Sequence, residues 1–316
     1  MTTWSAPIYV YLWLAGMAGG SYFAAFLAER FAGYNQRRLT QLAIQMGVLP
    51  AVLGVLLLLA DLGNPLRFWH LLAEFNILSP MSMGTWILLA WVAIAVVMNV
   101  LYRYEGQHGE PGGRPIHRLN GGLGWLQFLF SILLMSYTGV LLATSNRALW
   151  AGSALIPPLF VASAVSTGIA VLIAYILVVA PVTTGKTTEY RLPARLLTGS
   201  TEWAIPTRLV GRLWEAEAIV ILVELVVLIG LVAWLGSSAM AGAREALNML
   251  TFGALAAPFW VGVVLLASIV PLAFDMMSPG KELARREVFR VALASSVCVL
   301  LGALFLRAVI VIGGQL

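Results

Sequence analysis

Charged residues are scarce in this chain, with 19 Lys and Arg and 14 Asp and Glu among 316 residues. Roughly a quarter of the residues in a soluble domain are charged. Here 10% of the residues are charged and 60% are hydrophobic, and the mean hydropathy is +0.91. Apolar runs longer than about 18 residues, the length of a transmembrane helix, recur from end to end. We therefore expect a chain embedded in a lipid bilayer, with no catalytic centre for a soluble substrate.

Cysteine and histidine are also nearly absent. The one cysteine, Cys298, lies within an apolar run, so the chain can hold neither an internal disulfide nor a Cys-ligated iron–sulfur cluster or zinc finger. A transmembrane haem pair needs imidazoles at membrane depth. His108 and His117 instead fall in a polar segment, and His70 lies near a membrane surface. We expect no haem and no iron–sulfur cluster in this chain.

The apolar runs predict an all-α membrane protein with eight transmembrane helices. Each run is long enough to cross about 30 Å of hydrocarbon at 1.5 Å per residue, and none alternates as a barrel strand would. The predicted spans lie near residues 8–29, 41–60, 80–102, 121–143, 155–180, 214–235, 247–273 and 289–311.

The distribution of Lys and Arg predicts the orientation of these spans. Fifteen of the 19 basic residues fall in the segments on one side, and only Arg67, Arg147, Arg244 and Arg307 are assigned to the other. Since cytoplasmic segments collect Lys and Arg, both termini are expected on the periplasmic side of a bacterial inner membrane. The net charge of +5 is spread over short segments, so a nucleic-acid partner is not expected. No cleavable signal peptide is expected before the first span.

A polar cluster follows the second span at the periplasmic boundary. Gly63 and Pro65 end the helix, and Asp61, Arg67 and His70 lie close together in sequence there. A quinone head group needs hydrogen-bond donors for two carbonyl oxygens, a titratable group connected to water and an apolar slot, and these residue types are present. The alternative is a capped helix end with an ion pair and interfacial aromatic residues.

Other polar and aromatic residues are expected at the same depth. Tyr137 and Thr138 lie near the periplasmic end of the fourth span, and Tyr9 and Trp13 near the start of the first. Aromatic residues at this depth also form interfacial belts. The predicted quinone-binding residues are Tyr9, Trp13, Asp61, Arg67, His70 and Tyr137. In the first span, Gly16 and Gly20 have GxxxG spacing, which favours close helix packing.

Several motifs together resemble the NrfD/PsrC-like family, the membrane subunits of polysulfide reductase and related molybdopterin oxidoreductases. They are the Trp-rich start of the first span with its Gly/Ala run, the segment from Asp61 to Trp69, the Ser-Pro-Met-Ser-Met-Gly segment that ends at Gly84, the Tyr-Thr-Gly-Val-Leu-Leu segment that begins at Tyr137, and the Pro-Pro-Leu-Phe segment that begins at Pro157. The resemblance extends over nearly the whole chain.

The resemblance implies two four-helix bundles, with a quinone site near the periplasmic face of the first. We expect the first bundle in residues 1–143 and the second, with a possible proton path, in residues 144–316. It implies a menaquinone or ubiquinone ligand, a four-cluster ferredoxin-like iron–sulfur partner subunit and a molybdopterin catalytic subunit. Tyr137 is similar in place to the family's quinone-contacting tyrosine. A quinone-contacting Asn/His pair in the first span of some members has no match here.

Ionisable residues in the second half are candidates for a proton path because burying them in a membrane is costly. Glu217 and Glu224 lie about two turns apart in the sixth span. Glu215 lies near the basic boundary, where a carboxylate remains hydrated or paired. The alternative role for Glu224 is a hydrogen bond between helices.

Three functions are consistent with these features. The leading hypothesis is a subunit of a quinone-dependent oxidoreductase that exchanges electrons between membrane quinone and a periplasmic iron–sulfur subunit. A secondary transporter is the first alternative, although its site would be expected at mid-membrane on broken helices in related halves. The second alternative is a membrane anchor without redox chemistry, which would need no ordered quinone pocket.

Overall fold

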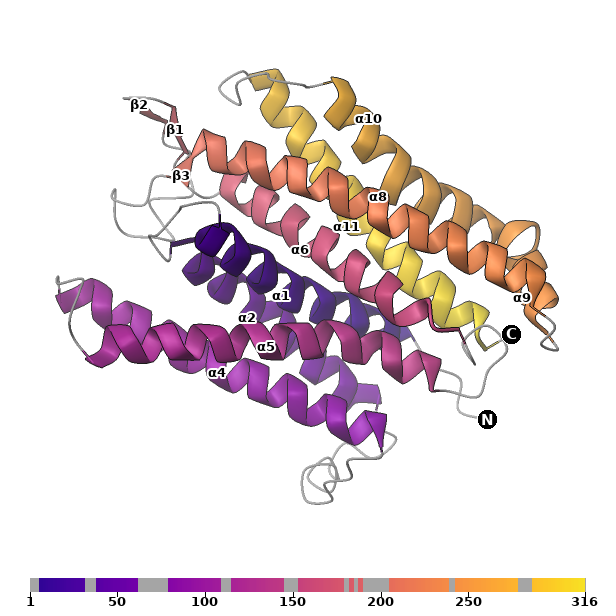
Figure 1. Cartoon of the computed structure of the whole chain (residues 1–316), viewed down its shortest axis with the longest axis horizontal. Helices are drawn as coiled ribbons and strands as arrows, with labels where there is room; N and C mark the ends of the chain where they lie inside the picture. Colours follow the sequence, from indigo (N-terminus) through magenta and orange to yellow (C-terminus); the bar gives the residue numbers. More distant parts are fainter. Residues whose placement is uncertain are drawn as a thin grey trace.

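In a computed structural model, the described part of the chain consists mainly of helices, most of them long (Figure 1). The structure describes residues 6–31, 38–61, 79–108, 115–144, 153–178, 182–184, 187–189, 205–238, 242–277 and 286–315. The helices are α1 (Ala6–Phe31), α2 (Arg38–Asp61), α4 (Pro80–His108), α5 (Pro115–Ala143), α6 (Ile156–Val178), α8 (Thr207–Ser237), α9 (Ala243–Thr251), the π-helix η2 (Pro258–Ile269), α10 (Val270–Met277) and α11 (Arg286–Gly313).

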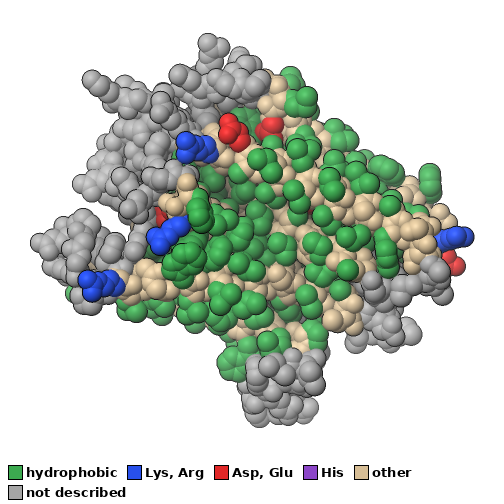
Figure 2. Space-filling model, viewed as in Figure 1, with side chains coloured by type: hydrophobic (Ala, Val, Ile, Leu, Met, Phe, Trp, Pro, Cys, Tyr) green, Lys and Arg blue, Asp and Glu red, His purple; other side chains and the backbone are tan. Residues whose placement is uncertain are grey.

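Eight spans in the described residues are long and apolar enough to cross a membrane, which confirms the predicted number. Their outward faces are apolar. Val100, Val226 and Ile229 are each at least 60% exposed, and Figure 2 shows hydrophobic side chains over the middle of the molecule. Such a surface is stable only where lipid tails cover it. The fold is therefore that of a multi-pass membrane protein.

The seventh span begins later than the sequence predicted. The predicted span 247–273 is divided, because α9 ends at Thr251 and the membrane-spanning part runs from Pro258 to Met277 as η2 and α10. The chain turns between them, and the Trp260 indole donates a hydrogen bond to the Thr251 carbonyl (3.0 Å). Pro258 has no N–H to continue an incoming helix, which explains why the apolar run is not one helix.

A small sheet joins α6 and α8, in a segment where only a solvated loop was expected. Strands β1 (Val182–Thr184) and β2 (Thr187–Glu189) pair antiparallel, and β3 (Ile205–Pro206) pairs parallel to β1. The sheet precedes α8 and contacts it.

Helix α1 lies at the centre of the fold and packs against α2, α5, α6 and α11. Its small residues permit this close approach. A Cβ on Gly20 would overlap the Ala164 backbone of α6, and a Cβ on Gly168 of α6 would overlap the backbone of Gly20. The packing role predicted for Gly20 is therefore confirmed.

The two ends of the helix array differ in charge. Arg30, Arg103, Arg118, Arg212 and Arg290 lie where α1, α4 and α10 end and α5, α8 and α11 begin. We call this the basic end; Figure 2 shows basic side chains there, on the left of the view. We call the opposite end the terminal end, since α1 begins there and α11 ends there (Figure 1).

Arg307 belongs to neither end. From the sequence it was assigned to the periplasmic basic residues, but its side chain is 0% exposed inside the helix array. It therefore carries no information about orientation.

Candidate functional site

Two buried tyrosines meet near the terminal end, Tyr11 of α1 and Tyr137 of α5. They are 1% and 7% exposed. Tyr11 lies about 8 Å from the start of α1 and Tyr137 about 9 Å from the end of α5, at 1.5 Å per residue. The two phenols are close enough to interact electrostatically. By geometric criteria the Tyr11 hydroxyl has no hydrogen-bond partner among the described residues.

Glycines on two neighbouring helices make room for these rings. A Cβ on Gly84 of α4 would overlap the Tyr137 ring, and a Cβ on Gly54 of α2 would lie 3.2 Å from Cδ2 of Tyr11. Each glycine thus lets an aromatic ring lie across a helix backbone. Helices α1, α2, α4 and α5 together enclose this place, which we call the tyrosine pocket (Tyr11, Gly54, Gly84 and Tyr137).

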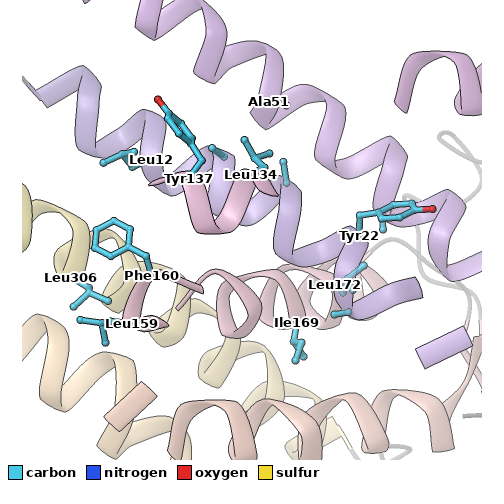
Figure 3. Packing of buried hydrophobic residues seen from close by; sticks show 14 of the residues in the cluster. Leu12, Tyr22, Ala51, Leu134, Tyr137, Leu159, Phe160, Ile169, Leu172 and Leu306 are labelled. Atoms are coloured by element: carbon cyan, nitrogen blue, oxygen red, sulfur yellow. The ribbon is translucent and has the colours of Figure 1, made fainter. Parts of the chain in front are cut away.

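Figure 3 shows how Tyr137 lies relative to Phe160 and Leu306 of the second half of the chain. Tyr137 projects from α5 with its hydroxyl directed away from Phe160 and Leu306. Thr138, which was predicted at the same depth, donates its hydroxyl to the Met135 carbonyl of its own helix (2.7 Å). The Thr138 hydroxyl is therefore bonded within its own helix, whereas the Tyr11 and Tyr137 hydroxyls lie at the pocket.

The structure does not bring Trp13 to the tyrosine pocket. The Trp13 indole donates a hydrogen bond to the Leu300 carbonyl of α11 (3.1 Å). Residues two apart on a helix point about 200° apart, and residues four apart share a face. Tyr9 therefore shares the Trp13 face of α1, whereas Tyr11 points to the opposite side.

The remaining predicted residues of this site lie outside the described part of the chain. Asp61 ends α2, but its side chain is not among the described ones, and Arg67 and His70 fall between the described ranges. Tyr11 was not predicted from the sequence. The sequence indicated only its depth in the membrane, which is similar to that of Tyr137, Gly54 and Gly84.

A hydrogen-bonded chain fixes α4 against α5 nearer the middle of the membrane. The Trp91 indole donates to the Ser131 hydroxyl (2.9 Å), which donates to the Gln127 carbonyl (2.8 Å). Tyr22 of α1 donates to the Gly124 carbonyl (3.1 Å). These bonds hold α1, α4 and α5 in register, and therefore hold the tyrosine pocket in place.

A second polar cluster lies between α1, α6, α8 and α11. Arg307 donates to the Leu12 carbonyl (3.2 Å) and to the Ser163 hydroxyl (3.2 Å). Glu224 accepts a hydrogen bond from Ser166 (2.9 Å) and interacts electrostatically with Arg307. Gly16 leaves room for the guanidinium, since a Cβ there would lie 2.5 Å from Nη2. Glu224 thus faces the protein interior beside a compensating charge.

Glu217, the other predicted proton-path residue, has different neighbours. It is 1% exposed, and neither of its carboxyl oxygens has a hydrogen-bond partner among the described residues. It interacts electrostatically with Asp275 of α10. Ile221 lies between Glu217 and Glu224 on α8 and packs with Ala170 and Val299. The two glutamates are therefore held in separate environments.

Comparison with known proteins places the whole sequence in one family. The family described as "Polysulphide reductase, NrfD" matches residues 1–316. One of the polysulfide reductase chains of Wolinella succinogenes is 28% identical over 99% of this sequence and 94% of its own length. Protein NrfD of Escherichia coli is 30% identical over 53% of this sequence and 58% of its own, and the NrfD homolog of Haemophilus influenzae is 24% identical over 99% and 94%. The protein described here is a member of the NrfD family of polysulphide reductase membrane subunits.

Proposed function

We propose that this protein is the membrane subunit of a respiratory oxidoreductase complex and exchanges electrons between membrane quinone or quinol and a periplasmic iron–sulfur subunit. The observation that carries the proposal is the tyrosine pocket, where Tyr11 and Tyr137 meet beside Gly54 and Gly84. Membership of the NrfD family supports the same class of complex.

The residues of the tyrosine pocket fit a quinone head group. Buried polar groups are nearly always hydrogen-bonded. The Tyr11 hydroxyl has no hydrogen-bond partner among the described residues, so it is a donor available to a carbonyl oxygen. Tyr137 offers a second hydroxyl next to it. A bound quinone supplies two-electron, two-proton redox chemistry. The protein orients the head group, excludes water through the apolar rings and helices, and offers phenol protons to it.

Asp61, Arg67 and His70 complete this proposal on the side of the aqueous phase. Asp61 is the last residue of α2, and Arg67 and His70 follow it in the sequence. At the pocket, a carboxylate or an imidazole would pass protons between the quinone and water. Tyr9 and Trp13, on the other face of α1, would contribute to the apolar wall between the two halves.

The finer architecture is part of the proposal. Residues 1–143 would form a first four-helix bundle with the quinone site, and residues 144–316 a second one, with both termini in the periplasm of a bacterial cell. The few basic residues opposite the basic end support this orientation. The segments 61–79 and 144–157 would then bind a four-cluster ferredoxin-like iron–sulfur subunit, and a molybdopterin catalytic subunit would complete the complex.

We also propose that the second bundle carries protons through Glu217 and Glu224. Buried ionisable side chains in a membrane support a role in ion or proton movement, and Glu217, Glu224 and Arg307 are each at most 4% exposed. The same observation is the one that favours the alternative of a transporter. Proton uptake without any quinone-dependent activity would favour that alternative.

The experiment that tests the quinone proposal compares matched tyrosine variants in the intact complex. Tyr11→Phe and Tyr137→Phe each remove one hydroxyl at the pocket, and Tyr9→Phe removes one from the other face of α1. A hydrogen bond contributes about 0.5–1.5 kcal/mol, so its loss should make quinol-coupled turnover about 2- to 10-fold slower in the first two variants. Equal effects in all three variants would exclude the tyrosine pocket as the quinone site.

A further inference from the structure

Glu217 and Asp275 form a pair of buried carboxyl groups that quinone exchange does not use. Glu217 lies about 15 Å from the start of α8 at the basic end, and Asp275 is two residues from the end of α10 at the same end. Helices α8 and α10 pack against each other. All four carboxyl oxygens are buried, and none has a hydrogen-bond partner among the described residues.

Such a pair is costly unless a positive charge compensates it. When one of two nearby carboxyl groups is ionised, its negative charge makes ionisation of the other unfavourable, and burial adds a desolvation cost. The ionisable side chains on α8 and on the described elements packed against the pair are Arg212, Glu215, Glu224, Tyr175, Arg244, Glu245, Arg290, Cys298 and Arg307. None of them is hydrogen-bonded to Glu217 or Asp275. No described cation is therefore hydrogen-bonded to the pair, and a bound proton would remove one of its two negative charges.

We propose that Glu217 and Asp275 are a proton-binding dyad that holds one proton and exchanges it with the aqueous phase at the basic end. The proton binds to a carboxyl oxygen of one residue and leaves the other residue ionised, so that the pair carries one negative charge instead of two. No electron transfer or covalent bond to another group is involved.

A proton fits the site better than a metal ion does. Hard metal cations take about six or more oxygen ligands, whereas this site offers two carboxyl groups. The described part of the chain contains no group of three or more His, Cys, Asp or Glu side chains that could hold a metal. A single proton needs only one acceptor oxygen.

An apolar layer separates the dyad from the Glu224 cluster. Ile221 lies four residues after Glu217 and three before Glu224, and its side chain is 0% exposed. It packs with Ala170 of α6 and Val299 of α11, which are 0% and 1% exposed. Apolar side chains neither donate nor accept a proton, so the dyad exchanges with the basic end rather than with Glu224 in this arrangement. Proton transfer from Glu217 to Glu224 along the proposed path therefore requires this apolar layer to rearrange.

The dyad can be tested by infrared spectroscopy on the intact complex in lipid, through the carbonyl stretch of protonated carboxyl groups during a pH titration. We expect Glu217→Gln to remove one titrating band and Asp275→Asn to shift its midpoint, because the two groups are coupled. Glu215→Gln, an exposed carboxylate on the same helix, is the matched control and should leave the band unchanged. Unchanged spectra in both dyad variants, or a band lost on adding Na⁺ at constant pH, would overturn the proposal.

A second measurement uses the unmodified protein, so it still tests the dyad if a variant fails to assemble. Dicyclohexylcarbodiimide modifies protonated carboxyl groups in apolar surroundings, and mass spectrometry locates the product. We expect modification of Glu217 or Asp275 before Glu215; preferential modification of Glu215 would contradict the dyad. Neither measurement involves quinone. The dyad bands should therefore persist in Tyr11→Phe, and failure of the quinone proposal would leave this result unaffected.

Discussion

Replacing Gly84 by alanine tests how closely the tyrosine pocket depends on one missing methyl group. The added Cβ would overlap the Tyr137 ring, and because this ring is buried between helices it has to move. Inserting a methyl group into a packed interior costs about 1–3 kcal/mol. Alanine in a helix is favoured over glycine by up to about 1 kcal/mol, so we expect a net destabilisation of up to about 2 kcal/mol.

The same displacement should reduce activity. If Tyr137 loses one hydrogen bond to the quinone, quinol-coupled turnover should fall by about 2- to 10-fold. Turnover and thermal unfolding are measured on the same complex in lipid nanodiscs. Gly54→Ala should have a smaller effect, since its Cβ would lie 3.2 Å from the Tyr11 ring.

Gly122 provides the matched control. A Cβ at this glycine of α5 would meet nothing within 4 Å, so Gly122→Ala should leave turnover unchanged and should not lower thermal stability. Equal turnover and equal thermal stability of Gly84→Ala and Gly122→Ala would show that the Tyr137 ring does not depend on the space at Gly84.

Two further predictions concern the centre of the fold. Gly20→Leu should prevent assembly of the subunit, because even a Cβ overlaps the Ala164 backbone; the amount of assembled complex in membranes checks this, and normal assembly would contradict the α1–α6 packing. Arg307→Met should destabilise the protein by about 3–5 kcal/mol, since it leaves Glu224 without its compensating charge. Adding Glu224→Gln should restore part of that loss in thermal unfolding, and strictly additive effects would show that the two side chains are not coupled.

Depth in the membrane could be predicted from the sequence, whereas rotation about a helix axis could not. Apolar length had to match the bilayer, so the number of spans and the depth of Tyr137 followed from the runs. Helix α1 packs against four helices and is apolar on nearly all sides. No periodic pattern therefore indicated that Tyr11, rather than Tyr9 or Trp13, faces Tyr137.

Charge within the spans was difficult to interpret for a related reason. A lone arginine near the end of an apolar run, such as Arg307, is expected at the membrane boundary. Its burial is explained by its hydrogen bonds to the Leu12 carbonyl, 295 residues away in sequence, and to the Ser163 hydroxyl. Asp275 lay beyond the predicted end of the seventh span, and its position opposite Glu217 depends on where α10 ends. Such contacts between distant segments leave no local pattern in a single sequence.

The most direct test of the quinone proposal is photoaffinity labelling of the intact complex with an azido-quinone, followed by mass spectrometry of the labelled peptides. We expect label on α1 around Tyr11 and on α5 around Tyr137, with an excess of unmodified quinone preventing it. Labelling confined to α8, α10 or α11, or label on the first helices that unmodified quinone does not displace, would contradict the proposal.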